Sequence, residues 1–313
     1  MPSGEPARGA GASRHALQID VTEVAGLGEP LHIGLELLLP ATAPRLLFAC
    51  VPGGGMNRRY FDLPRPDGEA ETSFARAMLA RGHAVLLVDP LGVGESSLPR
   101  DPYALHPDSN AAAIGAAVRH IGDGLRAGTL VDGVSPLGGL RAIGTGHSFG
   151  ALLTIVAQAR EPIFAAVALF GFHTGGQPGY VAEADRHLDA GEVRRRLCEL
   201  ARLRFADALM TLQAPPSTRA VSLASAMDRL PSTTSLMAIT PDIVSPDAAA
   251  IAAPVLIALG EQDMHSDPHR TPAAYTASRD VTLLVLPDTR HNHFIYPSRT
   301  WLFERTARWA EAL

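Results

Sequence analysis

The sequence predicts an α/β protein with a mainly parallel central sheet and helices on both faces of that sheet. Short apolar runs alternate with helical stretches along most of the 313 residues, a pattern typical of successive strand–helix–strand units. Apolar residues make up 46% of the chain and charged residues 19%, which is enough to bury a large core. No segment repeats with a period of about 20–50 residues, which argues against solenoids and propellers.

The first part of the chain is expected to form a tail and then three strands. Residues 1–15 are small, polar and rich in glycine, which favours a flexible end. Apolar runs predict strands at 16–24 and 31–39. The apolar run 45–51 stops at a Pro-Gly-Gly-Gly sequence, so it predicts a buried strand that leads into a tight loop. Apolar residues at helical spacing then predict a helix within 69–81.

The middle of the chain continues this alternation. An Ala-rich stretch predicts a helix at 109–126, with Ser109 or Asp108 as its N-terminal cap. A second helix is expected at 151–160, directly after a strand. The strands predicted here are 84–88, 140–146 and 163–170.

No strand-like run occurs between residues 171 and 246. Residues 182–210 carry apolar side chains on one helical face, and Pro-rich spots follow. An insertion of this size between two strands is expected to form a helical cap, 171–246, over the carboxyl ends of the strands, where functional residues collect in such sheets. The core is then predicted to comprise 16–170 and 247–313. Its last elements are predicted as strands at 254–259 and 281–286 and helices at 269–278 and 298–313.

Composition and charge exclude several classes of protein. The net charge of −5 argues against a nucleic-acid-binding protein with a basic surface. All 27 basic residues are arginine, which excludes lysine Schiff-base chemistry and a P-loop that needs its lysine. Cys50 and Cys198 are too few for a disulfide framework and are expected to be reduced thiols in a cytoplasmic protein. No signal peptide and no membrane span are predicted, because the uncharged runs contain Gly, His and polar residues.

The strongest local signal is Gly146-His147-Ser148-Phe149-Gly150, which follows a predicted strand and begins a predicted helix. This is the context of a nucleophile elbow, where the serine occupies a sharp turn and the two glycines let strand and helix approach closely. A dinucleotide-binding loop around Gly144-Thr145-Gly146 is the rival interpretation. It lacks the third glycine and a clear acidic partner about 20 residues further on.

Acid and base candidates follow the serine in the order that a Ser-Asp-His triad would need. Asp263 comes directly after the strand at 254–259, with Asp267 and Glu261 as rivals. His291 and His293 follow the strand at 281–286. If this segment is extended, the two histidines point to opposite sides, so only one of them is expected to face the serine.

Four landmarks in order make the chain resemble the α/β-hydrolase superfamily from about Ala16 to the end. They are the Gly-rich loop 51–56, the turn Asp89-Pro90-Leu91-Gly92-Val93-Gly94-Glu95-Ser96, the elbow, and the order Ser, Asp, His. The loop has Val51-Pro52 where many members carry a histidine. The resemblance implies a capped, esterase- or lipase-like serine hydrolase, and a structural role for the 89–96 turn.

The resemblance also implies roles for individual residues. Ser148 would be the nucleophile, His291 the base and Asp263 the acid. Phe149 would supply one backbone N–H of the oxyanion hole, and Gly54, Gly55 or Met56 would supply the other. The expected reaction is hydrolysis of a small-molecule ester, thioester or lactone through an acyl-enzyme on Ser148, and this route uses no cofactor. An acyltransferase with the same acyl-enzyme and a non-catalytic ligand-binding protein are the alternatives. A homodimer is compatible with these features.

Two further groups of residues have competing interpretations. Asp263, His265, Asp267 and His269 alternate, and they could form a metal site with His291 and His293. The triad accounts for Asp263 and His291 without a metal, so no metal is expected, and His147 is expected to pack beneath the elbow. Met210, Met227 and Met237 lie in the predicted cap. They would line an apolar substrate pocket or pack in an ordinary core.

Overall fold

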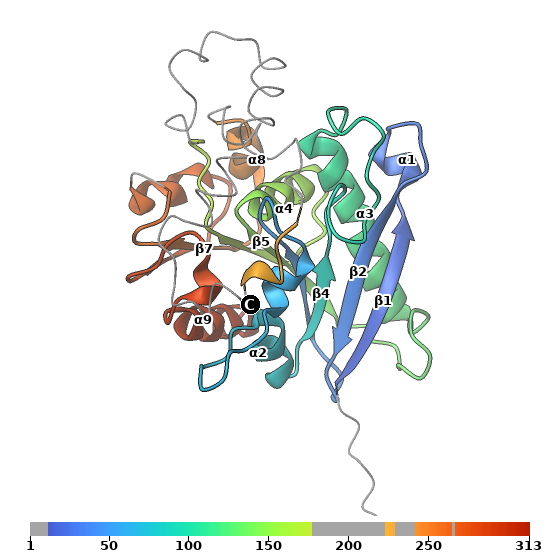
Figure 1. The fold of residues 1–313 in the computed structure, drawn as a ribbon, viewed down its shortest axis with the longest axis horizontal. Coiled ribbons are helices and arrows are strands. Elements are labelled where there is room, and N and C mark those ends of the chain that lie inside the picture. The colour runs from blue at the N-terminus through green and yellow to red at the C-terminus, as the bar shows by residue number, and fades with distance from the viewer. Residues whose placement is uncertain (1–11, 177–222, 229–241, 265–266) are drawn as a thin grey trace, which may run out of the picture.

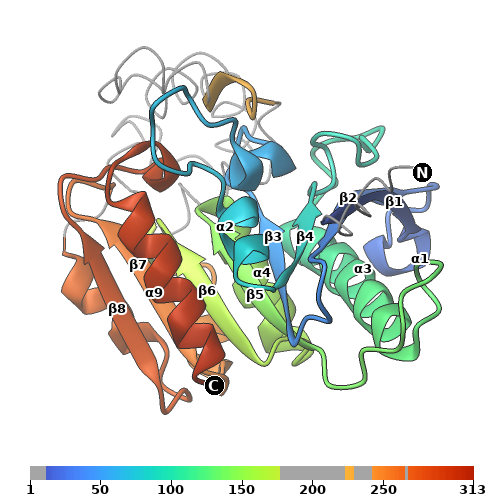
Figure 2. The ribbon, with the colours of Figure 1, turned by 90° about the horizontal axis from the view of Figure 1, so that it is seen from below.

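The computed structural model describes residues 12–176, 223–228, 242–264 and 267–313. Within these residues the chain forms an eight-stranded sheet in the order β1-β2-β4-β3-β5-β6-β7-β8, with helices on both faces (Figures 1 and 2). Every neighbouring pair from β4 to β8 in this order is parallel. The first two pairs are antiparallel. The sheet therefore confirms the predicted fold class.

The strands follow the apolar runs of the sequence. Their bounds are β1 Ser13–Asp20, β2 His32–Leu39, β3 Leu46–Val51, β4 Ala84–Val88, β5 Arg141–His147, β6 Ala166–Phe170, β7 Val255–Gly260 and β8 Val281–Leu286. Every residue of β3, β4, β6 and β7 is buried, because helices cover both faces of a parallel sheet.

The helices divide between the two faces. Their bounds are α1 Thr22–Ala25, η1 Arg58–Asp62, α2 Phe74–Ala80, α3 Pro107–Ala127, α4 Phe149–Arg160, α8 Ser245–Ala250, η4 Pro268–Ala274, η5 His293–Ile295 and α9 Arg299–Glu311, where η marks a 3-10 helix. Apolar residues of α1, α3, α4 and α8 pack with one set of alternate strand residues. Those of α2 and α9 pack with the other set, and Figure 2 shows these two helices together over one side of the sheet. Strand alternation thus gives the protein two cores, one on each face.

Several element boundaries differ from the prediction. The sheet begins at Ser13, which pairs with Leu39, so the end of the predicted 1–15 tail is part of a strand. The predicted strand 16–24 stops at Asp20, whose carboxylate accepts the N–H of Thr22 at 2.8 Å, and α1 follows. The cap of α3 is His106 rather than Ser109 or Asp108, because Pro107 occupies the first helical position.

The predicted helix at 269–278 is also shorter and wound differently. The chain forms the 3-10 helix η4, which carries Pro268 at its start and Pro272 inside it. A proline has no N–H for an i to i−4 hydrogen bond, which disfavours a regular α-helix here. Asp267 caps η4 by accepting the N–H of His269 at 3.0 Å.

Most of the predicted cap lies outside the described residues, and with it Met210, Met237, Cys198 and the Arg-rich stretch 194–196. Cys50, in β3, is a buried free thiol. In the described part of the chain, no helix combines the length and the hydropathy needed to cross a bilayer.

Candidate active site

Ser148 lies at the junction of β5 and α4 in a strained backbone conformation. Its φ is +51° and its ψ −117°, and a positive φ is uncommon for a residue other than glycine. The turn is held on both sides: the N–H of Ser148 donates to the carbonyl of Phe170 at 2.7 Å, and its carbonyl accepts the N–H of Ala151 at 2.9 Å. The serine is 5% exposed. These features are those of the predicted nucleophile elbow.

The positions of Gly146 and Gly150, on either side of Ser148, have no room for a side chain. A Cβ on Gly146 would lie 2.5 Å from the Cα of Ala151 in the first turn of α4. A Cβ on Gly150 would collide with the carbonyl oxygen of Val51 and approach that of Pro52 to 2.5 Å. The start of α4 therefore packs directly on the backbone at the end of β3, which brings the loop after β3 to the elbow.

That loop passes close to Ser148 itself. A Cβ on Gly53 would lie 3.4 Å from the Cβ of Ser148 and 2.7 Å from Nδ1 of His147. Gly55 has a φ of +76°, a conformation that glycine adopts readily. The N–H of Met56 donates to the carbonyl of Gly53 at 3.2 Å, so this donor is used within the loop.

A short piece of the insertion, residues 223–228, binds the same loop. The N–H of Asn57 donates to the carbonyl of Ala226 at 2.9 Å, and the N–H of Asp228 donates to that of Gly55 at 2.8 Å. Met56 and Met227 face each other in an antiparallel bridge. Met227 was predicted as a pocket residue; it lies beside the loop, and 41% of its surface is exposed. The insertion thus contributes backbone contacts to the loop next to the serine.

The side chain of Asp228 extends this contact. Its Oδ2 accepts a hydrogen bond from Nδ2 of Asn57 at 3.1 Å and another from the N–H of Gly94 at 3.2 Å. One carboxylate therefore links the insertion to the loop after β3 and to the turn after β4.

Asp263 follows β7 in a turn where its N–H donates to the carbonyl of Gly260 at 3.1 Å. Its side chain is 3% exposed. One oxygen, Oδ1, accepts hydrogen bonds from Nδ1 of His291 and from the N–H of Met264, both at 2.7 Å. The other oxygen, Oδ2, lies 3.1 Å from Nε2 of His293. Burial would raise the pKa of Asp263, but the charges and hydrogen bonds of His291 and His293 outweigh it and hold this pKa well below its usual range.

The structure brings both candidate histidines to this carboxylate. In an extended segment the two rings would point to opposite sides, and on that basis only one of them was predicted to face the serine. The chain instead winds into η5 at His293, so both rings reach Asp263. The rival acids are engaged elsewhere: Glu261 accepts the N–H of Asp288 at 3.1 Å, and Asp267 caps η4.

His147, directly before the serine, joins the elbow to the loop that carries His291. Its Nε2 donates to the carbonyl of His291 at 2.8 Å, and the two rings lie 4.9 Å apart. Burial, and then the charges of His291 and His293, hold the pKa of His147 well below its usual value, which favours the neutral form of this ring. It packs beneath the elbow as expected, and its hydrogen bond also places His291 beside Ser148's turn.

An aromatic cluster that no sequence pattern predicts packs against these rings. Tyr60 stacks on Phe294 at 4.7 Å, and its ring lies tilted beside that of His147 at 4.6 Å. Phe294, the middle residue of η5, also contacts other rings at the same place: Phe61, Phe74, Phe170 and Phe303. These residues come from elements far apart in the chain, so no local pattern marks them as one cluster.

The turn after β4 has the structural role that the resemblance implied. Asp89 accepts the N–H groups of Arg58 and Glu95 at 2.7 and 3.0 Å. Ser96 donates to the carbonyl of Asp89 at 2.5 Å and accepts the N–H of Gly34 at 2.8 Å. Burial raises the pKa of Asp89 despite these bonds. Its carboxylate holds backbone in place.

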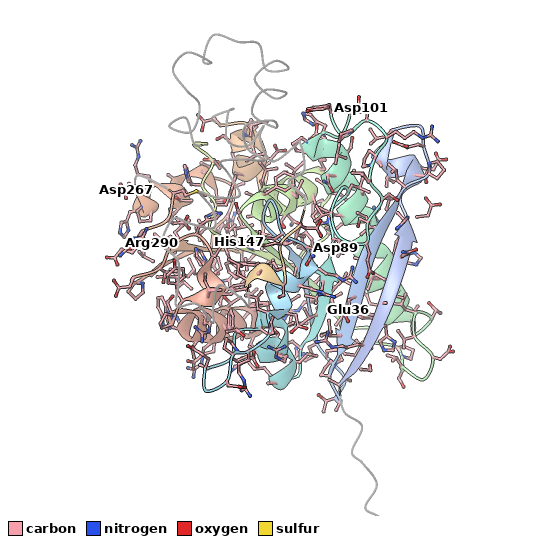
Figure 3. The ribbon with its side chains drawn as sticks, viewed as in Figure 1. Glu36, Asp89, Asp101, His147, Asp267 and Arg290 are labelled. Carbon is pink, nitrogen blue, oxygen red and sulfur yellow. The ribbon has the colours of Figure 1, made fainter. Side chains whose placement is uncertain are left out.

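The alternating Asp and His residues do not form a common cluster where they are described. Asp263 binds two imidazoles, whereas Asp267 lies at the left edge of the molecule in the view of Figure 3, and His147 lies near its middle. His265 is outside the described residues. Among the residues that the structure does describe, no group of three or more His, Cys, Asp or Glu side chains could hold a metal ion.

Solved structures share this fold at low sequence identity. A thermophilic esterase from Thermogutta terrifontis superimposes with a TM-score of 0.68 at 17% identity, over 95% of this chain and 99% of that one. A peroxisomal α/β-hydrolase from Saccharomyces cerevisiae gives 0.61 at 13% identity, over 96% and 88%. A bromoperoxidase from Bacillus anthracis gives 0.60 at 15% identity, over 93% and 100%.

The names of these structures cover different reactions, so at such identities the likeness establishes the fold alone. Among curated proteins, none matches the chain. A family model gives the assignment: residues 48–301, from β3 into α9, match the model described as the alpha/beta hydrolase family. This chain belongs to the alpha/beta hydrolase family.

Proposed function

We propose that this protein is a serine hydrolase that cleaves a carboxylic ester or a related acyl bond, an ester, thioester or lactone, through an acyl-enzyme on Ser148. One observation carries the proposal. Ser148, with a φ of +51° at the start of α4, directly follows His147 in the chain. The ring of His147 lies 4.9 Å from that of His291, and Nδ1 of His291 is hydrogen-bonded to the buried carboxylate of Asp263 at 2.7 Å. This arrangement supports Ser148 as the nucleophile, His291 as the base and Asp263 as the acid.

Asp263 determines which nitrogen of His291 is available. The ionised carboxylate only accepts hydrogen bonds, so Nδ1 of His291 carries the hydrogen in their 2.7 Å contact. Nε2 of the neutral ring then has a free electron pair to take the proton of the Ser148 hydroxyl. The buried charge of Asp263 stabilises the imidazolium that forms.

The reaction then runs in two halves. Ser148 Oγ bonds to the acyl carbon, and the proton held by His291 passes to the leaving alcohol or thiol as its bond to that carbon breaks. A water molecule next gives a proton to His291 and attacks the acyl-enzyme. Release of the acid returns the proton to Ser148, so the route consumes water and uses no cofactor.

The oxyanion of each tetrahedral intermediate needs two N–H donors. Phe149 is the first residue of α4, where backbone N–H groups have no acceptor within the helix and the helix dipole is positive. Gly54 and Gly55 are the better candidates for the second donor, because the N–H of Met56 is bonded to Gly53. Loss of one such donor typically costs about 2.7–4 kcal/mol of barrier.

Labelling with a fluorophosphonate tests the proposal directly. Purified protein should gain the mass of one phosphonate on the peptide that contains Ser148, and the Ser148→Ala variant should gain none. A folded protein that does not react, or a variant that still does, would exclude this mechanism. Short and medium p-nitrophenyl esters, thioesters and lactones, each with and without an added alcohol acceptor, would then identify the acyl bond and separate a hydrolase from an acyltransferase.

A further inference from the structure

The carboxylate of Asp263 is shared by two imidazoles, one on each oxygen. His291 takes Oδ1 through Nδ1, and His293 lies 3.1 Å from Oδ2 through Nε2. The proposed mechanism uses only the first contact. The side chain of His293 has no exposed surface, so its position next to the acid is not an accident of a mobile surface residue.

The fold holds His293 in place from several directions. Its N–H donates to the carbonyl of His291 at 3.0 Å, the same carbonyl that accepts Nε2 of His147. Its ring meets that of His147 edge to face, 5.6 Å apart at 80°. The next residue, Phe294, is fixed in the aromatic cluster. The ring therefore has a defined direction toward Asp263.

We infer that His293 is a positioning residue, which donates Nε2–H to Oδ2 of Asp263 and so keeps Oδ1 directed at Nδ1 of His291. A carboxylate can turn about its Cβ–Cγ bond, and a half turn only exchanges two equivalent oxygens. With a donor on each side, both oxygens are satisfied only when the plane of the carboxylate points at the two imidazoles. Without the second donor, a buried and charged oxygen would lack a partner on that side, which favours rotation of the group or its protonation.

This role fixes the protonation of His293. Because the ionised carboxylate is only an acceptor, Nε2 of His293 must carry a hydrogen whether the ring is neutral or charged. His293 does not exchange a proton with the substrate in this scheme, and it acts through Asp263 alone. Its loss should therefore lower kcat more than it changes KM.

A purely structural role for this ring makes a different prediction. If His293 only filled space in the buried cluster, an apolar side chain of similar length would replace it well, and a polar one would be costly. Glutamine and methionine separate the two roles, because both are unbranched and similar in length, but only the amide of glutamine can donate to Oδ2.

The experiment compares His293→Gln with His293→Met on one ester substrate, after thermal unfolding has shown that each is folded. We expect kcat of the methionine variant to fall about 10- to 100-fold below that of the glutamine variant, as for the loss of a hydrogen bond to a charged group, with similar KM values. Equal kcat values for the two variants, or a more active methionine variant, would overturn the inference.

A measurement on the wild-type protein keeps the inference testable if a variant does not fold. The 15N shifts and long-range couplings of the histidine rings report which nitrogen is protonated. We expect a hydrogen on Nε2 of His293 at neutral pH, and a neutral ring protonated only on Nδ1 would overturn the inference.

The kinetic comparison rests on the proposed function, and Ser148→Ala separates the two failures. If Ser148→Ala keeps its turnover, the proposed function is wrong, and the NMR result alone decides the role of His293. If Ser148→Ala is inactive while the glutamine and methionine variants have equal kcat, only the inference about His293 is wrong.

Discussion

Asp263→Asn should remove the charge of the acid while leaving its hydrogen bonds largely intact. The oxygen of the new amide would occupy the place of Oδ1, where the N–H of Met264 and Nδ1 of His291 both donate. The amide nitrogen would then face Nε2 of His293. A neutral histidine can become an acceptor there by moving its hydrogen to Nδ1. His291 would keep its tautomer, and only the negative charge would be lost.

The size of the effect follows from the contact distance. Nδ1 of His291 and Oδ1 of Asp263 are 2.7 Å apart, which places the centres of the two charges about 4 Å apart. At an effective dielectric constant of about 20, unit charges at this distance attract by about 4 kcal/mol. That attraction stabilises the imidazolium of the transition state, so kcat/KM should fall about 10³-fold. If the amide instead forced His291 into the wrong tautomer, as happens in a triad without a second imidazole, the rate would fall about 10⁴-fold.

The assay is kcat/KM of Asp263→Asn on one ester, with Asp267→Asn as the matched control. Asp267 is an exposed cap of η4, and its variant should differ from wild type by less than about tenfold, or roughly 1.4 kcal/mol. A loss below tenfold for Asp263→Asn in folded protein would refute the role of the charge. A loss of about 10⁴-fold or more would refute the tautomer change at His293.

Three other perturbations have expected outcomes. Ser148→Ala and His291→Ala should each lower kcat by several orders of magnitude without unfolding the protein; rates above a tenth of wild type would contradict the triad. Burial depresses the pKa of His147, so the unfolded chain binds one more proton below about pH 6.5, and wild-type stability should fall there with acidification by up to about 1.36 kcal/mol per pH unit. The free energy of unfolding, measured in urea at pH 7 and pH 5, should fall less with acidification for His147→Gln than for the wild type. An equal fall for the two proteins would show that His147 is charged in the folded state. Gly150→Ala should lower the free energy of unfolding by about 1–3 kcal/mol or more, and with it the Tm, because the new Cβ would meet backbone atoms. Gly138→Ala should leave the Tm nearly unchanged, because the space around Gly138 is open.

The sequence predicts the parallel part of the sheet well, because burial on both faces leaves a simple signature. β3, β4, β6 and β7 consist of residues that are all buried, and each appears in the sequence as an uninterrupted apolar run. The turn at Ser148 is predicted equally well. Gly146 and Gly150 are required by a close approach of backbone to backbone, and that requirement does not depend on distant side chains.

The contacts around Asp263 were less accessible to sequence reasoning. Whether His291 and His293 share a face depends on the backbone between them, and the alternation rule applies only to an extended strand. η5 begins at His293, and Phe294 within it packs against Tyr60 and Phe61, which are distant in the sequence. A tertiary contact of this kind changes local conformation without a local signal, as does the pairing of Met56 with Met227.

The pairing between residues 223–228 and the loop after β3 bears on the predicted division of the chain into a core and a cap. The backbone of this segment accepts a hydrogen bond from Asn57 and donates one to the carbonyl of Gly55. The carbonyl of Gly55 belongs to the same peptide group as the N–H of Met56, which donates to the carbonyl of Gly53. The contact thus holds the turn that carries the N–H groups of Gly54 and Gly55, the proposed oxyanion donors. The insertion therefore helps to set the geometry of the proposed oxyanion hole. Changes in residues 223–228 should therefore alter kcat of the proposed acyl transfer.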